Sequence, residues 1–493
     1  MKSQTATPIP RWLPQLRDIL FFAVFLAALA LGPRMLNMDG DLPRHLLTGR
    51  FIAETRSIPT VEPFAYPYEG RAYVSHEWLT DLLFYWIQNS FGLAGLVLLS
   101  AALLASTFTV IYSHASQRAD ARLPVLLLTL FGAAVTSLNW VARPHLISMF
   151  LLALWLVWTD KLARGEKFPA WIFIATMILW SNLHGEFIAG MLVSLAYTLG
   201  WTMEFLFNRL NTDPQTGRRL WIVFLAAGIA SLLNPATYHP YVTLIGFVNN
   251  DYLMSRMSEA NPPDFSQPGF TILLGLIAVS ILLLALNPKR LSAGQAFLLT
   301  GFTAMSLMAA RNVHLYGVVA PFALAETLHS LSRLAGIRSV EATLKQIEGQ
   351  ARSARWMIVT VIVFSVLVLG TRVRNIYAFD STFFPTQAVA WLEENPQQGR
   401  MFNDLNWGGY IAWKLWPEQK VFADSMADVS GEMTRAYETA ITLAPGWETI
   451  FTTYDIQWVI LPRDSALVRG LQTAGWELIY DNETTEIVRA PVP

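Results

Sequence analysis

Two aspartates stand directly after the first long apolar run of the sequence, in the triplet Asp39-Gly40-Asp41. One interpretation makes Asp41, which precedes Leu-Pro, the N-cap of a helix, where its carboxylate would accept backbone N–H bonds. The other makes the acids a catalytic base or a metal ligand at the mouth of a cavity, because an ionised carboxylate can deprotonate a nucleophile. His45, one helical turn beyond Asp41, could hydrogen-bond it or contact the same ligand.

Further ionisable side chains recur at the turns between apolar runs. They are His76 and Glu77, Arg143 and His145, His184 and Glu186, and Arg311 and His314. Ionisable groups near bilayer depth are costly and usually mark a cavity or a substrate path. Each also has a structural reading: Arg143 could snorkel, His184 could be a hydrogen-bonded core histidine, and His76-Glu77 could open a surface helix. Because all fall on one predicted side, together with Asp41, we expect one common cavity.

The composition is that of a membrane protein. Of 493 residues, 53% are hydrophobic and only 14% are charged, with a mean hydropathy of +0.38. A soluble chain has about 25% charged residues, so this chain cannot cover its surface with charge. The net charge of −1 argues against nucleic acid as a partner, because neutralising phosphates requires a basic surface. The absence of cysteine excludes disulfides, thiol nucleophiles and thiolate metal sites.

Eleven apolar runs could span a bilayer. They cover 18–36, 93–112, 123–138, 146–158, 170–183, 187–207, 220–233, 270–286, 293–309, 313–331 and 356–371. Several are shorter than the roughly 20 residues that a full span needs, so we expect their ends to extend into flanking polar residues. With the N-terminus inside, the cytoplasmic segments hold more Lys and Arg than the opposite loops, as the positive-inside rule predicts. The C-terminal region is then expected outside.

The first external loop, residues 37–92, is predicted to carry two amphipathic helices on either side of a proline-rich turn. One helical face of the first collects Leu42, Leu46, Leu47, Phe51 and Ile52. In the second, Trp78, Leu82 and Trp86 repeat every fourth residue, and Ser75 is expected to cap it. Such helices should lie at the membrane surface rather than cross it.

The chain divides into a membrane domain, residues 1–375, and a domain of soluble composition, residues 376–493. In the second, hydrophobic periodicity predicts helices at 384–396, 431–443, 445–455 and 465–475. It predicts strands at 400–404, 420–424 and 457–462, and a terminal hairpin at 476–490. Strands that alternate with helices indicate a small α/β domain.

The motifs of the sequence resemble those of the C-type glycosyltransferases (GT-C), in particular the bacterial glycosyltransferase 39-like and RgtA/B/C/D-like branch. The first loop shows Asp39-Gly40-Asp41, His45, Gly49, Ile58-Pro59 and His76-Glu77-Trp78-Leu79. Further matches are Ala142-Arg143-Pro144, Trp180-Ser181-Asn182-Leu183-His184-Gly185, Asn234-Pro235, Arg311, Asn406-Trp407-Gly408-Gly409-Tyr410 and Lys420-Val421-Phe422-Ala423-Asp424. The resemblance implies an α-helical polytopic membrane protein with about 11 transmembrane helices, a GT-C-like fold and a small extracytoplasmic α/β domain.

The resemblance also implies an activity. It is inverting transfer of a hexose or pentose from a polyprenyl-phosphate donor to a glycan, lipid or protein acceptor, at the outer face of the bacterial inner membrane. Asp41, with Asp39 beside it, would be the catalytic carboxylate. The substrate-binding residues would be His45, His76, Glu77, Arg143, His145, His184, Glu186, Arg311 and His314. No cofactor is required, and a divalent cation, Mg²⁺ or Mn²⁺, is left open. Membrane lipids are the other expected partners.

Two other classes of protein are compatible with the sequence. A transporter or flippase for a lipid-linked saccharide would need polar residues at mid-membrane and on both sides, which this chain mostly lacks. A non-catalytic scaffold with the C-type architecture would use the C-terminal domain to bind partners. A transferase assay separates the three.

Overall fold

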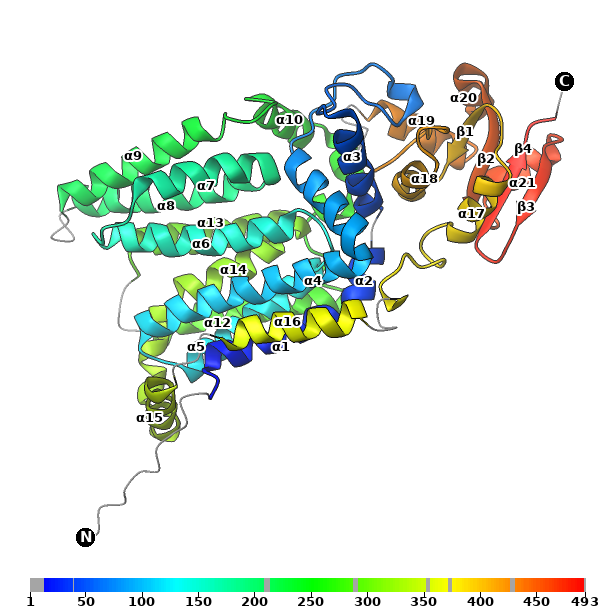
Figure 1. The fold of residues 1–493 in the computed structure, drawn as a ribbon. Coiled ribbons are helices and arrows are strands. Elements are labelled where there is room, and N and C mark those ends of the chain that lie inside the picture. Colours follow the sequence, from blue (N-terminus) through cyan, green and yellow to red (C-terminus); the bar gives the residue numbers. More distant parts are fainter. Residues whose placement is uncertain are drawn as a thin grey trace, which may run out of the picture.

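The computed structural model describes residues 13–38, 40–207, 213–286, 291–351, 355–370, 375–425 and 431–491. Long helices run side by side and form a bundle (Figure 1). A smaller part with a four-stranded sheet lies beyond one end of this bundle (Figure 1). The expectation of a mostly helical protein with a small α/β part at its C-terminus is confirmed at this level.

Helices occur at the position of every predicted apolar run. The bundle contains α1 (Leu16–Ala30), α4 (Trp78–Ala119), α5 (Leu123–Thr136), α6 (His145–Ala163), α7 (Ala170–Leu183), α8 (Phe187–Leu206), α9 (Pro214–Ala230), α12 (Pro268–Leu286), α13 (Ala293–Met308), α14 (Val313–Ala323) and α16 (Trp356–Gly370). Among the described residues, four helical segments are long and apolar enough to cross a membrane: Leu93–Ala119, His145–Ala163, Phe187–Leu206 and Pro268–Leu286. The count of eleven crossings stays a prediction.

Apolar side chains cover much of the outer surface of the bundle. Helix α12 exposes Ile281 and Leu282, and α16 exposes Ile362 and Val366. Soluble proteins rarely expose contiguous apolar surface on this scale, whereas lipid acyl chains cover such surface without cost. The helices therefore have the outer faces expected of a membrane protein.

The chain between α1 and the apolar part of α4 folds into short elements. They are α2 (Gly32–Asn37), α3 (Asp41–Thr55) and a 3-10 turn, η1 (Tyr66–Tyr68). Helix α4 contains the second predicted amphipathic helix and continues into the membrane-like segment through a break at Gly92, where φ is 69°. Only glycine adopts this left-handed backbone readily, so Gly92 divides the two parts of α4. Glu77, and not Ser75, precedes the first turn, and no side chain caps it, so the predicted Ser75 cap is wrong.

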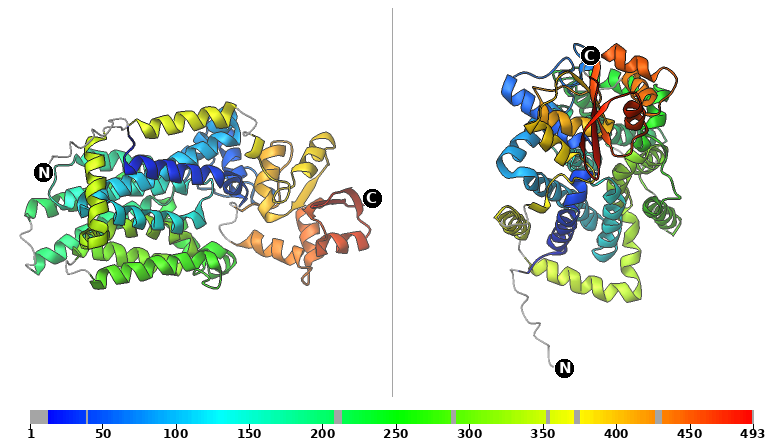
Figure 2. Two further views of the ribbon diagram at one scale, coloured as in Figure 1. Left: turned by 90° about the horizontal axis from the view of Figure 1, so that it is seen from below. Right: turned by 90° about the vertical axis from the view of Figure 1, so that its right-hand side faces the viewer.

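Short elements at the ends of the bundle helices complete the helical part. They are η2 (Ser137–Asn139), α10 (His239–Val248), α11 (Asp251–Arg256), η3 (Ser258–Ala260), η4 (Ala310–Asn312), η5 (Ala325–His329), η6 (Leu331–Arg333) and α15 (Ala335–Gln350). Helix α15 lies across the end of the bundle that is remote from the sheet (Figure 2). There the Glu341 carboxylate accepts hydrogen bonds from the backbone N–H groups of Arg122 and Leu123, at the start of α5. Which side of a membrane this end faces stays a prediction.

The C-terminal part is built from β1 (Arg400–Asn403), β2 (Ile456–Pro462), β3 (Glu477–Asp481) and β4 (Thr485–Arg489). The strand order is β1-β2-β4-β3, with β1 and β2 parallel and the other pairs antiparallel. Its helices are η8 (Leu405–Trp407), α17 (Thr386–Glu394), α18 (Gly408–Leu415), α19 (Glu432–Ile441), α20 (Trp447–Tyr454) and α21 (Ala466–Thr473). The predicted elements are present, with one exception.

The predicted strand at 420–424 does not join the sheet. Only Val421 makes a bridge, and its partner is Ala65 of the first loop. The next two N–H groups, of Phe422 and Ala423, donate instead to the side-chain oxygen of Asn403, at 2.8 and 3.3 Å. An asparagine side chain thus takes the place of a neighbouring strand, so the strand prediction was wrong.

The first loop and the C-terminal part share their buried core. Phe64 of the loop is fully buried with Met401 and Val421, and Tyr68 is buried in the cluster that contains Phe402. The Tyr66 hydroxyl donates a hydrogen bond of 2.9 Å to the Met401 carbonyl. The hydrophobic core of the C-terminal part is therefore completed by first-loop residues that precede it by more than three hundred positions.

Candidate functional site

The predicted acid Asp41 is the first residue of α3, at the end of the bundle that faces the C-terminal part (Figure 1). Gly40 holds the N-cap position, and α3 has no side-chain cap hydrogen bond. The Asp41 carboxylate instead contacts the Arg143 guanidinium and the Ser425 hydroxyl. The N-cap interpretation of Asp41 is therefore wrong. Asp39 lies outside the described residues.

Arg143 links Asp41 to a second carboxylate. One of its terminal nitrogens lies 3.5 Å from the Glu259 carboxylate, and a terminal nitrogen of Arg311 lies 3.9 Å from the other oxygen of Glu259. The four residues come from α3, the turn before α6, η3 and η4. Two arginines and two carboxylates thus form one continuous row, with both arginines partly exposed.

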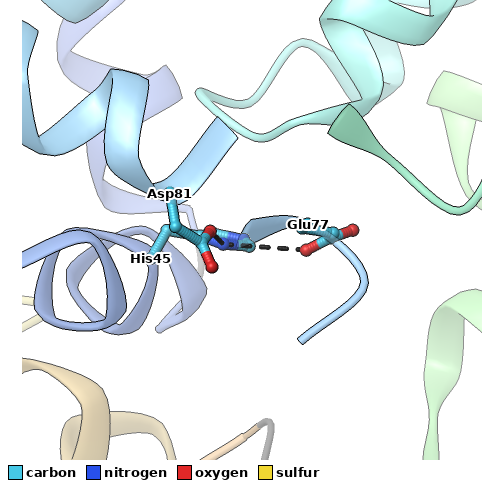
Figure 3. Close-up of side chains that lie close together, drawn as sticks. All are labelled: His45, Glu77 and Asp81. Atoms are coloured by element: carbon cyan, nitrogen blue, oxygen red, sulfur yellow. Dashed lines mark hydrogen bonds and ion pairs between the residues drawn. The ribbon is translucent and has the colours of Figure 1, made fainter. Parts of the chain in front are cut away.

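A second cluster lies where α3 meets the start of α4, and Figure 3 shows its three side chains. The His45 Nδ1 atom is 2.7 Å from Asp81 Oδ1 and 3.7 Å from Glu77 Oε2. Burial alone would lower the pKa of His45, but the hydrogen bond and the charge of Asp81, with the charges of Glu77 and Asp41, raise this pKa to about 9. His45 is therefore a protonated imidazolium at neutral pH.

Glu77 continues this cluster toward the turn between α7 and α8. Its Oε1 atom lies 3.2 Å from His184 Nε2 and 3.5 Å from His76 Nε2. Burial would raise the pKa of Glu77, but the nearby His76, His184 and His45 rings hold this pKa well below its usual range. Glu77 is therefore ionised, and it is the carboxylate that the three histidines share.

The protonation of His184 follows from its contacts. Its Nδ1 atom lies 2.8 Å from the Ser148 hydroxyl and 3.4 Å from the backbone N–H of Glu186. An atom that accepts an N–H bond carries no proton, so the ring proton must lie on Nε2, which faces Glu77. Burial lowers the pKa of His184, and this also favours the neutral ring.

The remaining predicted residues extend the row beyond His184. Glu186 Oε2 lies 3.6 Å from His184 Nδ1, and Glu186 Oε1 lies 3.0 Å from His314 Nε2. The His145 and His314 rings meet edge to face, with their centroids 5.2 Å apart. Burial would raise the pKa of Glu186, but the His314 and His184 rings bring this pKa down to about 2.

The structure thus brings the described candidates together in two rows of contacts. One is Asp41, Arg143, Glu259 and Arg311; the other is Asp81, His45, Glu77, His76, His184, Glu186, His314 and His145. The sequence reasoning missed Asp81 and Glu259. The spacing of Glu77 and Asp81, four residues apart at the start of α4, was a signal that could have found Asp81.

The position of α3 depends on a buried arginine between the two parts of the protein. Arg44 is 0% exposed, and its terminal nitrogens lie 2.8 Å from Glu62 and 2.7 Å from Asp424, which is also 0% exposed. Its guanidinium carbon lies 4.3 Å from the centroid of the Phe64 ring. Because a buried charge without its partners is costly, this triad fixes α3 against the C-terminal part.

Glycines allow α3 to approach its neighbours closely. A Cβ atom on Gly49 would come within 2.0 Å of the Asp81 carbonyl oxygen, and one on Gly409 would come within 2.7 Å of the Gly40 carbonyl oxygen. Any other residue at Gly49 would force α3 away from α4 and separate His45 from Asp81. The glycines of the first-loop and Asn-Trp-Gly-Gly-Tyr motifs therefore position the site.

His45, Glu77 and Asp81 are also near enough to one another to hold a metal ion, since their ligand atoms lie within 4.8 Å of one another. One imidazole and two carboxylates form a reasonable donor set for Mn²⁺ or Zn²⁺. A metal needs a neutral imidazole, whereas these carboxylates keep His45 protonated, with a pKa of about 9. The residues fit a metal by distance, and binding would have to displace this proton.

No family model and no curated protein matches the sequence. Two solved structures of the oligosaccharyltransferase of Archaeoglobus fulgidus are similar in fold. One of them carries an acceptor peptide that contains the NVT sequon and is tethered through a disulfide bond. Its TM-score is 0.57 at 11% sequence identity, and the match covers 90% of this chain and 69% of the oligosaccharyltransferase chain. The apo form gives a TM-score of 0.57 at 12% identity, with the same coverage. At this identity the likeness shows the fold alone.

Proposed function

We propose that this protein is a membrane glycosyltransferase that moves a sugar from a polyprenyl-phosphate donor to an acceptor. The reaction would occur at the end of the bundle where Asp41 lies, which we assign to the extracytoplasmic side of a bacterial inner membrane. The fold supports a transferase of this general type. The observation that carries the proposal is the contact between Asp41 and Arg143 beside a second arginine, Arg311. Glycosyl transfer from a lipid phosphate is assisted by a carboxylate that accepts the proton of the nucleophile and by cations that stabilise the leaving phosphate.

In the proposed reaction, an acceptor hydroxyl or amine attacks the anomeric carbon of the donor sugar. The new bond forms as the bond from that carbon to the phosphate oxygen breaks, and polyprenyl phosphate leaves with the electron pair. Asp41 accepts the proton of the nucleophile. Arg143 and Arg311 neutralise the negative charge that grows on the leaving phosphate.

The contact between Asp41 and Arg143 suggests how the donor would prepare the base. Each partner satisfies the charge of the other. The phosphate of an incoming donor would compete with the Asp41 carboxylate for the Arg143 guanidinium, which can bind a phosphate with two parallel hydrogen bonds. Donor binding would thereby release the carboxylate to face the acceptor.

The second row of contacts provides groups that could bind the hydroxyls of the sugar. Within the described residues, Glu186 Oε2 and His314 Nδ1 are buried atoms without a hydrogen-bond partner. Buried polar atoms normally have partners, so these are available to a ligand. We propose that Glu186 and His314, with Glu77 and His184 behind them, bind the donor sugar.

The acceptor is proposed to enter from the side of the C-terminal part. The Ser425 hydroxyl donates a hydrogen bond to Asp41, so the C-terminal part reaches the proposed base directly. A glycan, a lipid or a protein acceptor would pass between the two parts.

The decisive test is a transfer assay with membranes that contain the full chain and a mixture of polyprenyl-phosphate sugars labelled in the sugar. We expect labelled sugar in an acceptor fraction, and loss of this signal in the Asp41→Asn protein. Movement of labelled donor across the membrane without transfer would instead identify a flippase. Neither transfer nor movement, from protein that melts normally, would favour a scaffold. Repeating the assay with a chelator and with added Mg²⁺ or Mn²⁺ tests the need for a divalent cation.

A further inference from the structure

A polar pocket lies at the end of the bundle remote from Asp41. Its volume is about 470 Å³, and it lies between α4 and α6, with Arg17 of α1 and Met357 of α16 at its edge. Helix α4 contributes Ser106, Thr109, Val110, Ser113, His114 and Gln117, which share one helical face. Helices α1 and α16 begin at this end, close to α15 (Figures 1 and 2).

Two cations line this pocket without an ion pair to any carboxylate in the described part of the chain. Arg17 and Lys161 both line it, and neither makes an ion pair with any residue that the structure describes. The acid next to Arg17, Asp18, accepts a hydrogen bond of 2.9 Å from the backbone N–H of Gln15 and lines a separate apolar pocket. Asp18 thus interacts with Arg17 through its charge without forming an ion pair, and no carboxylate among the described residues forms an ion pair with Lys161.

The acids nearest the pocket are already paired with other cations. The carboxylate of Asp160 lies 2.8 Å from Arg164 and 3.0 Å from His114. Glu166 pairs with Arg118 at 2.5 Å, and Glu326 pairs with Arg164. The acids near Lys161 are therefore already neutralised, and Lys161 gives the pocket a positive charge.

The pocket also contains buried polar atoms that lack a hydrogen-bond partner within the described part of the chain. Thr109 is 6% exposed and lines the pocket, and its hydroxyl oxygen makes no hydrogen bond. The Nε atom of Arg17 is buried and likewise makes none. Leaving such donors unpaired costs free energy, so both point to a ligand that accepts hydrogen bonds.

Below these polar groups the walls are apolar. Val110, Phe150, Val157 and Met357 line the rest of the pocket, which opens on the surface of the bundle. We propose that the pocket binds an anionic phospholipid, with the phosphate of its head group held by Arg17, Lys161 and the Thr109 hydroxyl. A free phosphate ion would use the same cations, but it would leave the apolar walls uncovered. The site is distinct from that of sugar transfer, because it lies at the opposite end of the bundle.

The test is native mass spectrometry of the detergent-purified full chain, titrated with phosphatidylglycerol, phosphatidylcholine or inorganic phosphate. We expect phosphatidylglycerol to bind more tightly than phosphatidylcholine, whose head group has no net charge. Lys161→Gln should weaken the binding of phosphatidylglycerol about fivefold, the usual contribution of one cation to an anionic lipid. The matched control is Lys167→Gln, which removes an exposed cation outside the pocket and should leave binding unchanged.

Thr109→Val provides a second variant that keeps the shape of the side chain. If a lipid phosphate uses the hydroxyl, this variant also binds phosphatidylglycerol more weakly, while the melting temperature of the lipid-free protein does not fall. Equal binding of the two lipids, or equal binding by the Lys161→Gln and Lys167→Gln proteins, overturns the proposal. A rise in melting temperature with inorganic phosphate as large as that with phosphatidylglycerol would assign the pocket to a free anion and reject the lipid.

Discussion

Replacement of Asp41 by Asn separates the proposed catalytic role of this residue from a structural one. The side chains of Asp41 and Arg143 are 19% and 22% exposed. A partly exposed ion pair of this kind stabilises a protein by up to about 1 kcal/mol. Asn retains an oxygen that can accept hydrogen bonds from Arg143 and from the Ser425 hydroxyl. Gly40, and not Asp41, is the N-cap of α3, so the substitution removes no cap.

The expected effect on catalysis is much larger. Loss of a general base slows a reaction by about 10²–10⁴-fold. We therefore expect the Asp41→Asn protein to show a fall in kcat of at least about a hundredfold, with an unfolding free energy within about 1 kcal/mol of wild type. Initial rates of sugar transfer in membranes with matched amounts of protein measure the first quantity. Thermal unfolding in detergent measures the second.

Two control variants identify which carboxylate acts as the general base. Glu259→Gln removes the other carboxylate that contacts Arg143 and leaves Asp41 in place, so it should slow transfer far less. Asp39→Asn changes the neighbouring acid of the triplet and should also have the smaller effect. Full activity in the Asp41→Asn protein would refute the reasoning and shift the assignment to Asp39 or to a scaffold. A loss of rate that only accompanies unfolding would refute it as well.

Three further outcomes follow from the contacts. The pKa of His45 is about 9 in the folded protein, against 6.5 for an exposed histidine. The stability from its pairing with Asp81 is therefore complete below about pH 6.5 and is lost as the pH rises through 9. The shift is equivalent to about 3 kcal/mol, and the melting temperatures of the wild-type and His45→Asn proteins should converge at high pH. Asp424→Ala leaves the buried Arg44 short of one partner and should destabilise the protein by about 3–5 kcal/mol in denaturant unfolding, whereas loss of an exposed ion pair costs less than about 1 kcal/mol. A single cysteine at Ser465 should react with an impermeant thiol reagent on intact cells, and labelling only after lysis would contradict an external C-terminal part.

Much of the fold follows from local patterns. Apolar runs and hydrophobic periodicity predict the positions of the long helices and of α17, α19, α20 and α21, because these patterns are set within each segment. The strand at 420–424 was predicted wrongly because its partners are a side chain, Asn403, and a residue of the first loop, Ala65. Such partners are distant in the sequence, and no local sequence pattern indicates them.

The candidate site could be predicted in part for the same reason. His184 and Arg143 stand out because charged groups are rare beside apolar runs. Glu259 does not, because it lies in a polar loop with other acids, such as Asp251 and Asp264, and nothing local distinguishes it. Arg44 lies in the first predicted amphipathic helix, where a charged side chain is expected on the exposed face, yet it is fully buried. The burial of Arg44 depends on Glu62 and Asp424, so its role can be recognised only in the folded structure, where the first loop and the C-terminal part meet.

The shared core gives the C-terminal part a role in the site that a separate soluble domain would not have. Asp424 holds Arg44, and the next residue, Ser425, donates its hydroxyl hydrogen bond to Asp41, three residues before Arg44 on the same helix. The position of the proposed base therefore depends on residues more than 380 positions further along the chain. Arg44 would be left in a low-dielectric environment without Asp424 if the C-terminal part were removed, and α3 would have to move to hydrate it. Because α3 also carries His45, this movement would pull His45 away from Asp81 and disperse both rows of charges at once.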